Sequence, residues 1–193
     1  MGVHLYRDPE TELIERCRAG NGQAQRQLYE RYAGRLFGLC CRYIKDRMEA
    51  EDVLVTGFTK ILSKLDQYKG DGSFEGWMKR VIINEALSHL RRSRNMYLET
   101  DLEWAHAEPD YQRLHDVLEA EDLLQLVAEL PPGYRMVFNL YAIEGYNHQE
   151  IGAMLGISEN TSKSQLSRAR AMLIKQLEAL ELPAKKKVTN KTA

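Results

Sequence analysis

Long apolar runs are missing from the sequence. No stretch of about 18 apolar residues occurs, and a membrane-spanning helix requires one. The first residues also lack the apolar core of a secretory signal, and the opening Met-Gly lacks the Ser or Thr at the sixth position that accompanies myristoylation. We therefore expect a cytoplasmic protein that does not insert into a membrane.

Cysteine is also scarce. The three cysteines are Cys17, Cys40 and Cys41, and they fit no metal-ligand spacing. The adjacent pair is poorly suited to a disulfide. We expect reduced, mostly buried thiols, as is usual in the cytoplasm. The sequence predicts neither a metal site nor a cofactor.

An excess of basic residues is missing too. The 27 Lys and Arg residues are balanced by 28 Asp and Glu residues, and the formal net charge is −1. Overall basicity therefore cannot drive nucleic-acid binding, and any such binding must come from local charge. A chain of 193 residues can hold one domain or two small ones.

Strand-like alternation is absent from the first half of the chain, which shows helical periodicity instead. Helices are predicted at 12–19, 23–45, 49–65 and 74–94. The second has the apolar line Leu28, Tyr32, Leu36, Leu39 and Tyr43. The third has Val53, Leu54, Phe58, Ile61, Leu62 and Leu65 inward. Gly34 and Gly38 share one side of the second helix and predict a close helix crossing. This half is predicted to be a helical bundle.

A glycine-containing loop precedes the helix predicted at 74–94. Two glycines flank Asp71, and Ser73 can cap the helix. The composition fits a rigid loop that positions a polar pocket, and it fits a plain interhelical turn equally well. Aromatic and basic residues on the helix suit unstacked bases and phosphates, although arginines near a helix C-terminus also offset the helix dipole. The residues concerned are Trp77, Lys79 and Arg80, with further arginines beyond, and Asn84 is another exposed position of this helix.

The composition changes after this helix. Nine acidic residues lie between Tyr97 and Asp122, against the single Arg113. We predict two small helical domains, at 10–95 and 117–181, joined by a flexible acidic linker at 96–116. A basic, disordered tail is predicted at 182–193.

The second domain contains the pattern of a helix-turn-helix. Asn147 and Glu150 have capping-box spacing, Gly156 suits a left-handed helix end, and Ser158 can cap the next helix. Gly152 offers a bare surface for close helix approach. Leu166, Ala169, Leu173 and Leu177 form a predicted buried stripe. The opposite face and its edges carry Asn160, Thr161, Lys163, Ser164, Ser167, Arg168 and Arg170. Such a face suits the DNA major groove, although an ordinary helical hairpin with a solvated polar face has the same spacing.

Taken together, these segments resemble the extracytoplasmic-function (ECF) sigma factors, which give bacterial RNA polymerase its promoter specificity. The resemblance runs from about Glu12 to Leu180. In the first domain it rests on YERYAGRLFGL, AEDV and LDQYKGDGSFEGWMKRVIINEALSHLRR. In the second it rests on ELPPGYRMVFNLYAIEGYNHQEIGAMLGISENTSKSQLSRARAML. The expected fold is all-α, with a region-2-like bundle and a region-4-like helix-turn-helix domain.

The resemblance implies a role for each part. The first domain would bind the polymerase clamp through Asp52, Val55, Thr56, Thr59 and Lys60. It would capture and melt the −10 element with Lys69, Gly70, Asp71, Gly72, Ser73, Phe74, Trp77, Lys79, Arg80 and Asn84. The polar face of the second domain would read the −35 duplex. The implied partners are core RNA polymerase (clamp and flap), promoter DNA and an anti-sigma factor, and no residue is implied to be catalytic.

The sequence departs from the family pattern at four positions. Val55 and Thr56 replace a Gln and an acidic residue on the clamp-binding helix. Ser162 replaces a common Val and would loosen the buried side of the recognition helix, and Gln165 replaces a common Arg and would remove a phosphate contact. Two alternatives to a sigma factor are a sigma-like DNA-binding regulator or decoy with weakened polymerase binding, and a nuclease that uses the acidic residues.

Overall fold

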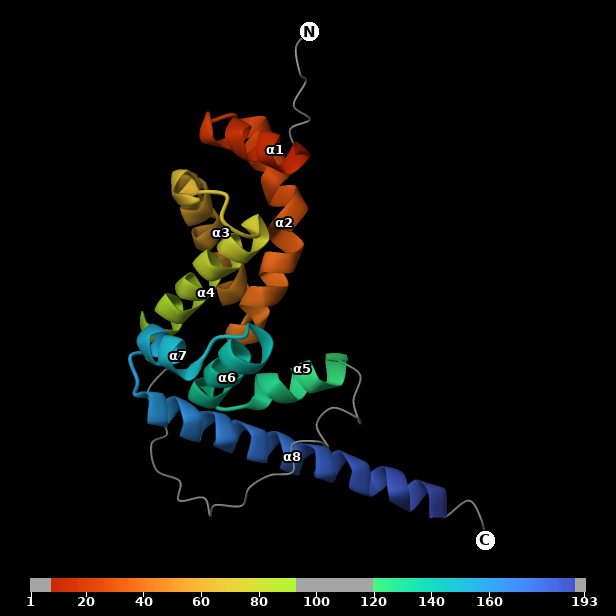
Figure 1. Ribbon diagram of the computed structural model, residues 1–193. Coiled ribbons are helices and arrows are strands. Elements are labelled where there is room, and N and C mark those ends of the chain that lie inside the picture. Colours follow the sequence, from red (N-terminus) through yellow and green to blue (C-terminus); the bar gives the residue numbers. More distant parts are fainter. Residues whose placement is uncertain (1–7, 93–119, 190–193) are drawn as a thin grey trace. The chain divides into compact units, whose positions relative to one another are not determined.

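The computed structural model describes residues 8–92 and 120–189, with side chains described at 8–92 and 124–179. The chain forms two compact units, 1–92 and 93–193, and each is described by itself. All regular elements in the described ranges are helices, which confirms the all-α prediction (Figure 1). The predicted linker at 96–116 lies outside the described residues.

The first unit is a helical bundle. It contains α1 (Pro9–Arg18), α2 (Gly22–Tyr43), α3 (Arg47–Ser63), the short 3-10 helix η1 (Leu65–Gln67) and α4 (Phe74–Arg92). Side-chain caps begin two of the helices: Asn21 Oδ1 accepts from the backbone N of Ala24 at 2.9 Å, and Asp46 Oδ1 accepts from that of Glu49 at 3.0 Å. Helices α2, α3 and α4 pack against one another, and α1 lies across the N-terminal end of α2 (Figure 1).

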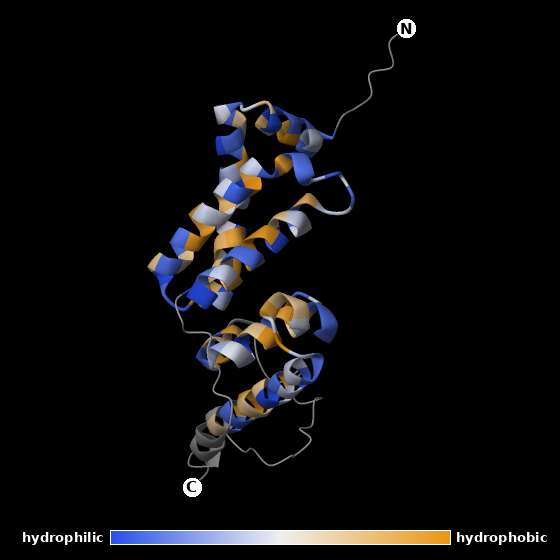
Figure 2. Cartoon of the chain, turned by 90° about the vertical axis from the view of Figure 1, so that its left-hand side faces the viewer, coloured by the Kyte–Doolittle hydropathy of each residue, from blue (hydrophilic) through white to orange (hydrophobic). Residues whose placement is uncertain are grey.

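The core of this unit follows the predicted periodicity. Apolar residues lie on the facing sides of the helices (Figure 2). The five residues predicted as the apolar line of α2 are at most 2% exposed, which confirms that line. Among the residues predicted inward on α3 and just after it, only Leu62 is half-buried, and the other five are buried.

The predicted close crossing at Gly34 and Gly38 is wrong. Both glycines are exposed, and a Cβ added at either would meet no atom within 4 Å. Four-residue spacing places two residues on one side of a helix but does not say which side faces a neighbour. The close approach is at Gly57 of α3, where an added Cβ would lie 2.5 Å from Cδ1 of Ile82 on α4.

The second unit contains α5 (Ala120–Glu129), α6 (Pro132–Phe138), the π-helical turn η3 (Asn139–Ile143), α7 (His148–Leu155) and α8 (Glu159–Thr189). Helix α6 is therefore extended by a widened turn, in which the backbone N of Glu144 donates to Asn139 O at 3.0 Å. The predicted stripe on α8 is confirmed, because Leu166, Ala169, Leu173 and Leu177 are all buried.

The end of α8 differs from the prediction of a disordered tail at 182–193. The helix continues through Pro183 as far as Thr189. Alanine and lysine, which follow the proline, are good helix formers.

The described residues also bear on the predictions about membrane segments, metal sites and cysteines. None of the helices in these ranges is long and apolar enough to cross a membrane. No group of three or more His, Cys, Asp or Glu side chains within them is placed to hold a metal ion. The thiols are free: Cys17 and Cys40 are buried and Cys41 is exposed. Burial raises the pKa of Cys40 to about 12.

Candidate nucleic-acid interface

The loop at 69–73, called the glycine loop below, is held by hydrogen bonds of its own. Gly70 and Gly72 have φ of +85° and +81°, in the left-handed region that favours glycine. The hydroxyl of Tyr68 donates to Gly72 O at 2.8 Å and spans the loop. Ser73 Oγ accepts from the backbone N of Gly76 at 3.3 Å and caps α4. These contacts favour the interpretation of a preorganised loop over that of a plain turn.

An aromatic cluster lies beside this loop. Phe74 is 1% exposed and stacks on Trp77, with ring centroids 5.7 Å apart and an interplanar angle of 16°. The ring of Tyr68 lies 5.0 Å from Phe74 and 5.7 Å from Trp77. Trp77 and Tyr68 are only half-buried, so part of each ring remains accessible next to the glycine loop. Partly accessible aromatic rings of this kind offer stacking surfaces for bases.

The outer face of α4 continues from this cluster. Trp77, Arg80 and Asn84 follow one another at spacings of three and four residues, which places them on one side of the helix. Arg80 and Asn84 are exposed. Lys79 is turned to an internal partner, with its Nζ 3.4 Å from Glu75 Oε1. The structure therefore places Trp77, Arg80 and Asn84 on one side of α4, whereas Lys79 forms an ion pair with Glu75.

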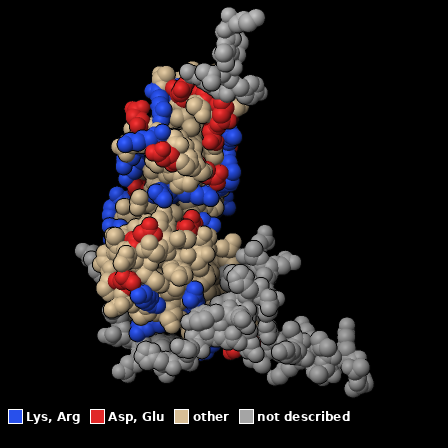
Figure 3. Space-filling model, viewed as in Figure 1, with Lys and Arg blue, Asp and Glu red and all other residues tan. Residues whose placement is uncertain are grey.

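The surface charge of the first unit is mixed. On the face shown in Figure 3, basic and acidic side chains are interspersed and form no patch of one sign. This agrees with the formal net charge of −1 for the whole chain. Contacts with nucleic acid must therefore come from specific local groups.

The predicted polymerase-binding residues lie on α3. Asp52, Val55, Thr56 and Thr59 are exposed and share one side of the helix by spacing. Val55 is 57% exposed. A shallow groove of about 350 Å³ adjoins it and is lined by Tyr29, Ala33, Gly34, Phe37, Arg47, Glu51, Leu54 and Val55.

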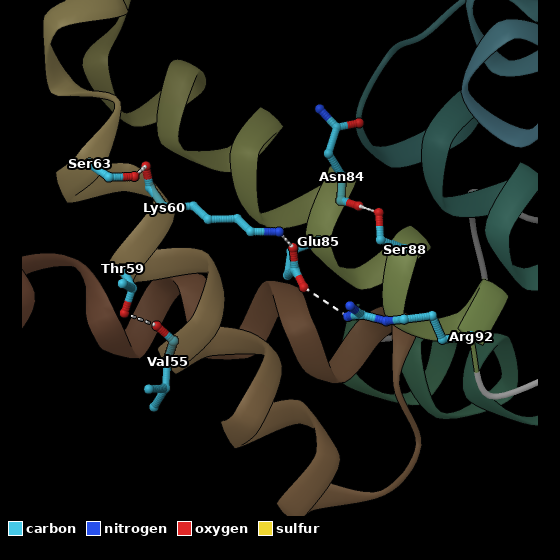
Figure 4. Close-up of polar contacts among 8 residues, drawn as sticks. All are labelled: Val55, Thr59, Lys60, Ser63, Asn84, Glu85, Ser88 and Arg92. Carbon is cyan, nitrogen blue, oxygen red and sulfur yellow. Dashed lines mark hydrogen bonds and ion pairs between the residues drawn. The ribbon is translucent and has the colours of Figure 1, made fainter.

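Lys60 differs from the other residues in this set. Its ammonium group forms an ion pair with the carboxylate of Glu85 on α4, and Arg92 Nη2 lies 3.1 Å from the other oxygen of that carboxylate (Figure 4). Glu85 is 3% exposed, so this buried carboxylate links α3 to the end of α4. Sequence reasoning missed Glu85. The available signal was its position, since it follows Ile82 by three residues on the buried side of α4.

The helix-turn-helix has the predicted caps. Asn147 Oδ1 accepts from the backbone N of Glu150 at 2.9 Å, and Glu150 Oε2 accepts from that of Asn147 at 2.8 Å, which completes the capping box. Gly156 ends α7 at φ +72°. Ser158 Oγ accepts from the backbone N of Thr161 at 3.0 Å and caps α8.

Gly152 allows the two helices to meet. It is buried, and an added Cβ would lie 2.8 Å from the backbone oxygen of Ile157 in the turn. The predicted bare surface is confirmed, and the group that approaches it is the backbone of the turn. Ile151, next to it on α7, is buried, whereas Leu155 is only half-buried.

The predicted polar face lies on the first three turns of α8. Asn160, Lys163, Ser164 and Ser167 are exposed, and Thr161, Arg168 and Arg170 are half-buried. Two of the cations have partners within the unit. Lys163 Nζ lies 2.7 Å from Glu159 Oε1, and the Arg170 guanidinium lies 5.7 Å from the centre of the Tyr141 ring. The structure thus presents these seven residues on one accessible side.

Ser162 and Gln165 have structural roles that the sequence did not indicate. Ser162 is fully buried, and its Oγ lies 2.9 Å from Nδ1 of His148 on α7. It links the two helices, contrary to the prediction that it loosens them. Gln165 is 8% exposed, and its amide packs against Gly133 at the start of α6. Its side chain is therefore part of the interior of the unit.

His148 lies at the centre of this arrangement. Its ring stacks on that of Tyr141, with centroids 4.5 Å apart and an interplanar angle of 21°. Burial lowers the pKa of His148 below its ordinary value, Lys163 and Arg170 act in the same direction, and Glu159 opposes them. The folded domain thus favours the neutral imidazole, which the first turn of a helix also prefers.

The second unit should become less stable at mildly acidic pH. Below about pH 6.5 an unfolded histidine takes up a proton, while the folded His148 stays neutral to lower pH, so protons favour the unfolded state. Thermal unfolding of the full chain at about pH 7.5 and about pH 5.5 measures the loss. His148→Gln, which cannot titrate, should reduce it. An equal loss in both proteins would assign the pH dependence to other groups.

Comparison with known proteins gives the same two-part division. A family model described as Sigma-70 region 2 matches residues 28–96, and one described as Sigma-70, region 4 matches residues 120–173. The chain is 28% identical to the RNA polymerase sigma-H factor of Pseudomonas aeruginosa, over 91% of this chain and 97% of that protein. It is 26% identical to the ECF RNA polymerase sigma-E factor of Escherichia coli, over 87% of this chain and 94% of that protein.

Solved structures agree with this comparison. CnrH, solved in complex with the cytosolic domain of CnrY, matches with a TM-score of 0.50 and 25% identity, over 89% of this chain and 99% of that one. The fold also matches that of the sigma factor RpoE from Bartonella quintana, with a TM-score of 0.51 and 22% identity, over 79% and 96% of the two chains. Regions 2 and 4 are both present, and the relatives named above are RNA polymerase sigma factors that match over nearly their full length. The chain therefore belongs to the ECF group of the RNA polymerase sigma factor family.

Proposed function

We propose that this sigma factor directs core RNA polymerase to promoters by reading the −35 element as duplex DNA with α8, and by capturing the melted −10 element with the glycine loop and α4. The observation that carries this proposal is the capped helix-turn-helix, which presents an exposed polar face on a buried apolar stripe. The chain itself would act in the cytoplasm as an initiation factor and catalyse no step, since polymerisation belongs to the core enzyme.

The −35 role depends on the N-terminal turns of α8. A recognition helix places such turns in the major groove, where its side chains reach base edges and phosphates. Lys163 and Ser164 are exposed there, with Ser167 and Arg168 one turn further on. In the free protein Lys163 is paired with Glu159. A DNA phosphate or a guanine would replace that carboxylate as its partner.

Removal of the side chain of Lys163 or Arg168 should weaken binding to −35 duplex DNA. We expect Lys163→Ala and Arg168→Ala each to lose about 1–3 kcal/mol if the side chain reads a base. A fluorescence titration with base-substituted duplexes separates two modes: loss confined to one base pair marks a reader, and uniform loss marks a phosphate contact. Lys175→Ala removes an equal charge at an exposed position of α8 beyond the seven residues of the polar face and serves as the control. Unchanged binding in both variants would contradict the −35 role.

The −10 role depends on the glycine loop and its aromatic neighbours. Extrusion of a base from the stack costs a few kcal/mol, which a preformed pocket offsets. The loop is fixed by the Tyr68 hydroxyl, and Trp77 offers a partly exposed ring beside it. Asn84 lies two turns along α4 on the same side and is exposed (Figure 4). We infer that this face separates the strands while the loop holds the extruded base.

Asn84→Ala should impair promoter opening more than initial binding. The amide would contact bases only as the duplex separates, so the closed complex should form with nearly wild-type affinity. Open-complex formation should fall by about tenfold, the effect of one lost polar contact to a base. Permanganate footprinting reports opening, and filter binding on an unmelted duplex reports the closed complex. Equal loss in both measurements would exclude this role for Asn84.

The polymerase contact is proposed for α3 and the groove beside it. Asp52, Val55, Thr56 and Thr59 form an accessible face of α3 beside this groove. We propose that this face meets the clamp, that Lys60 contributes while bridged to Glu85, and that the second unit meets the flap. Since RpoE of Bartonella quintana, which has a similar fold, was solved in complex with the anti-sigma factor NepR, we also propose an anti-sigma protein as a partner.

A further inference from the structure

The N-terminal helix α1 precedes the segment that matches region 2, which begins at residue 28. Its last residue nevertheless reaches the chain that leads into the glycine loop. We propose that Arg18 of α1 is a positioning residue for the −10 loop: it fixes the turn before the loop, so that the base pocket is formed before DNA arrives. This inference rests on the proposed −10 role of the loop.

The contacts of Arg18 are specific to this turn. Its Nε and Nη2 donate to Leu65 O at 3.2 Å and 3.0 Å, and Nη2 also donates to Tyr68 O at 2.5 Å. The acceptors are the first residue of η1 and the residue that ends it. Leu65 O also accepts from the backbone N of Tyr68 at 3.2 Å, and the planar guanidinium fork of Arg18 reaches both carbonyls at once. Arg18 therefore sets the distance and orientation between these two carbonyls.

Tyr68 transmits this restraint to the loop. Arg18 holds its backbone oxygen, while its hydroxyl donates to Gly72 O on the far side of the loop at 2.8 Å. Between these two ends the ring packs against Phe74 and Trp77. A change in the position of the Tyr68 backbone would therefore move both the span of the loop and the aromatic surface next to it.

The other end of α1 is anchored to the same aromatic cluster. The carboxylate of Glu10 accepts a hydrogen bond from the Tyr32 hydroxyl, and Arg31 Nη2 lies 3.9 Å from the same carboxylate oxygen. The Tyr32 ring meets Phe74 edge-on, with centroids 6.1 Å apart. Between the two ends, the buried residues Leu13, Ile14 and Cys17 hold α1 on the bundle. Both polar anchors of α1 thus end on residues that touch the −10 cluster.

The test compares Arg18→Ala with Arg18→Lys, and uses Arg16→Ala as a control that removes an equal charge from an exposed position of the same helix. Each full-length variant is combined with core RNA polymerase. The readouts are polymerase affinity, closed-complex affinity, the rate of opening followed by 2-aminopurine fluorescence in the −10 element, and binding to single-stranded −10 probes with each base in turn at the extruded position.

We expect Arg18→Ala to bind polymerase and closed promoter within about twofold of wild type, as for a surface change away from both contacts. Opening should slow by about tenfold or more, because a loosened pocket loses its preorganisation, and discrimination among the four bases should flatten. Arg18→Lys keeps the charge without the fork and should lie between Arg18→Ala and wild type. Arg16→Ala should match wild type.

Wild-type opening and base discrimination in Arg18→Ala would overturn the inference. An equal loss in polymerase binding and in opening would overturn it as well, since that marks general destabilisation of the bundle. If Arg18→Ala does not fold, Arg18→Lys decides: unchanged discrimination contradicts the positioning role, and flattened discrimination supports it. A wild-type protein that binds polymerase but captures no −10 base would instead overturn the −10 role, and the inference with it.

Discussion

Replacement of Phe74 by alanine should produce the largest loss of stability in the first unit, about 3–5 kcal/mol in the free energy of unfolding. Phe74 is 1% exposed and touches three other rings, those of Tyr32, Tyr68 and Trp77. Its removal would leave a cavity that these rigid rings cannot easily fill. A domain of this size is stable by only about 5–15 kcal/mol, so the variant should be close to unfolding at physiological temperature.

Phe74→Leu separates stability from function. Leucine keeps most of the apolar volume, so the expected loss is smaller, about 1–2 kcal/mol. It removes the stack with Trp77, so promoter opening should still fall in a variant that remains folded. Chemical denaturation of the full chain measures the first effect, and permanganate footprinting with core polymerase measures the second. Wild-type opening by Phe74→Leu would show that the stacked ring has no part in the −10 site.

Gly152→Val should disrupt the helix-turn-helix. The added Cβ would lie 2.8 Å from the backbone oxygen of Ile157, and a backbone group in a short turn cannot rotate away as a side chain can. Overpacking against such a fixed group should destabilise the second unit by about 3 kcal/mol or more. Since the turn sets the angle between α7 and α8, binding to −35 duplex DNA should be lost while the first unit keeps its stability.

The control for this variant is Ala153→Val. Ala153 is the next residue of α7 and is exposed, so valine there adds only the small penalty of a β-branched residue in a helix, a few tenths of a kcal/mol. Duplex binding and thermal unfolding of the two variants, measured in parallel, isolate the close approach at Gly152. Similar behaviour of Gly152→Val and Ala153→Val would contradict the packing described for the turn.

Much of the fold could be predicted because its signals are local. The capping box of Asn147 and Glu150, the left-handed Gly156 and the Ser158 cap each depend on residues within one helical turn. The apolar lines of α2 and α8 depend on spacing alone. These signals define the helix-turn-helix and place Lys163, Ser164, Ser167 and Arg168 on its accessible side before any tertiary contact is considered.

The remaining features depend on contacts between distant residues. Arg18 donates to carbonyls 47 and 50 residues further along the chain, and no local pattern points to them. Glu85 is acceptable inside the bundle only because Lys60 and Arg92 meet it there. Reasoning from residue spacing failed at Gly34 and Gly38, because the spacing identified a shared side of α2 but not whether another helix packs against that side. It also failed at Ser162, because the structural role of this residue depends on its hydrogen bond with His148 of the preceding helix.

The most direct test of the central claim combines the full chain with core RNA polymerase. Co-purification shows whether the two associate, and run-off transcription on the fragment upstream of its own gene shows whether the complex initiates. We predict stable association and discrete transcripts whose yield falls in Arg168→Ala and Asn84→Ala. Binding to promoter DNA without association with polymerase and without transcripts would contradict the account, and would assign the chain to the DNA-binding regulators.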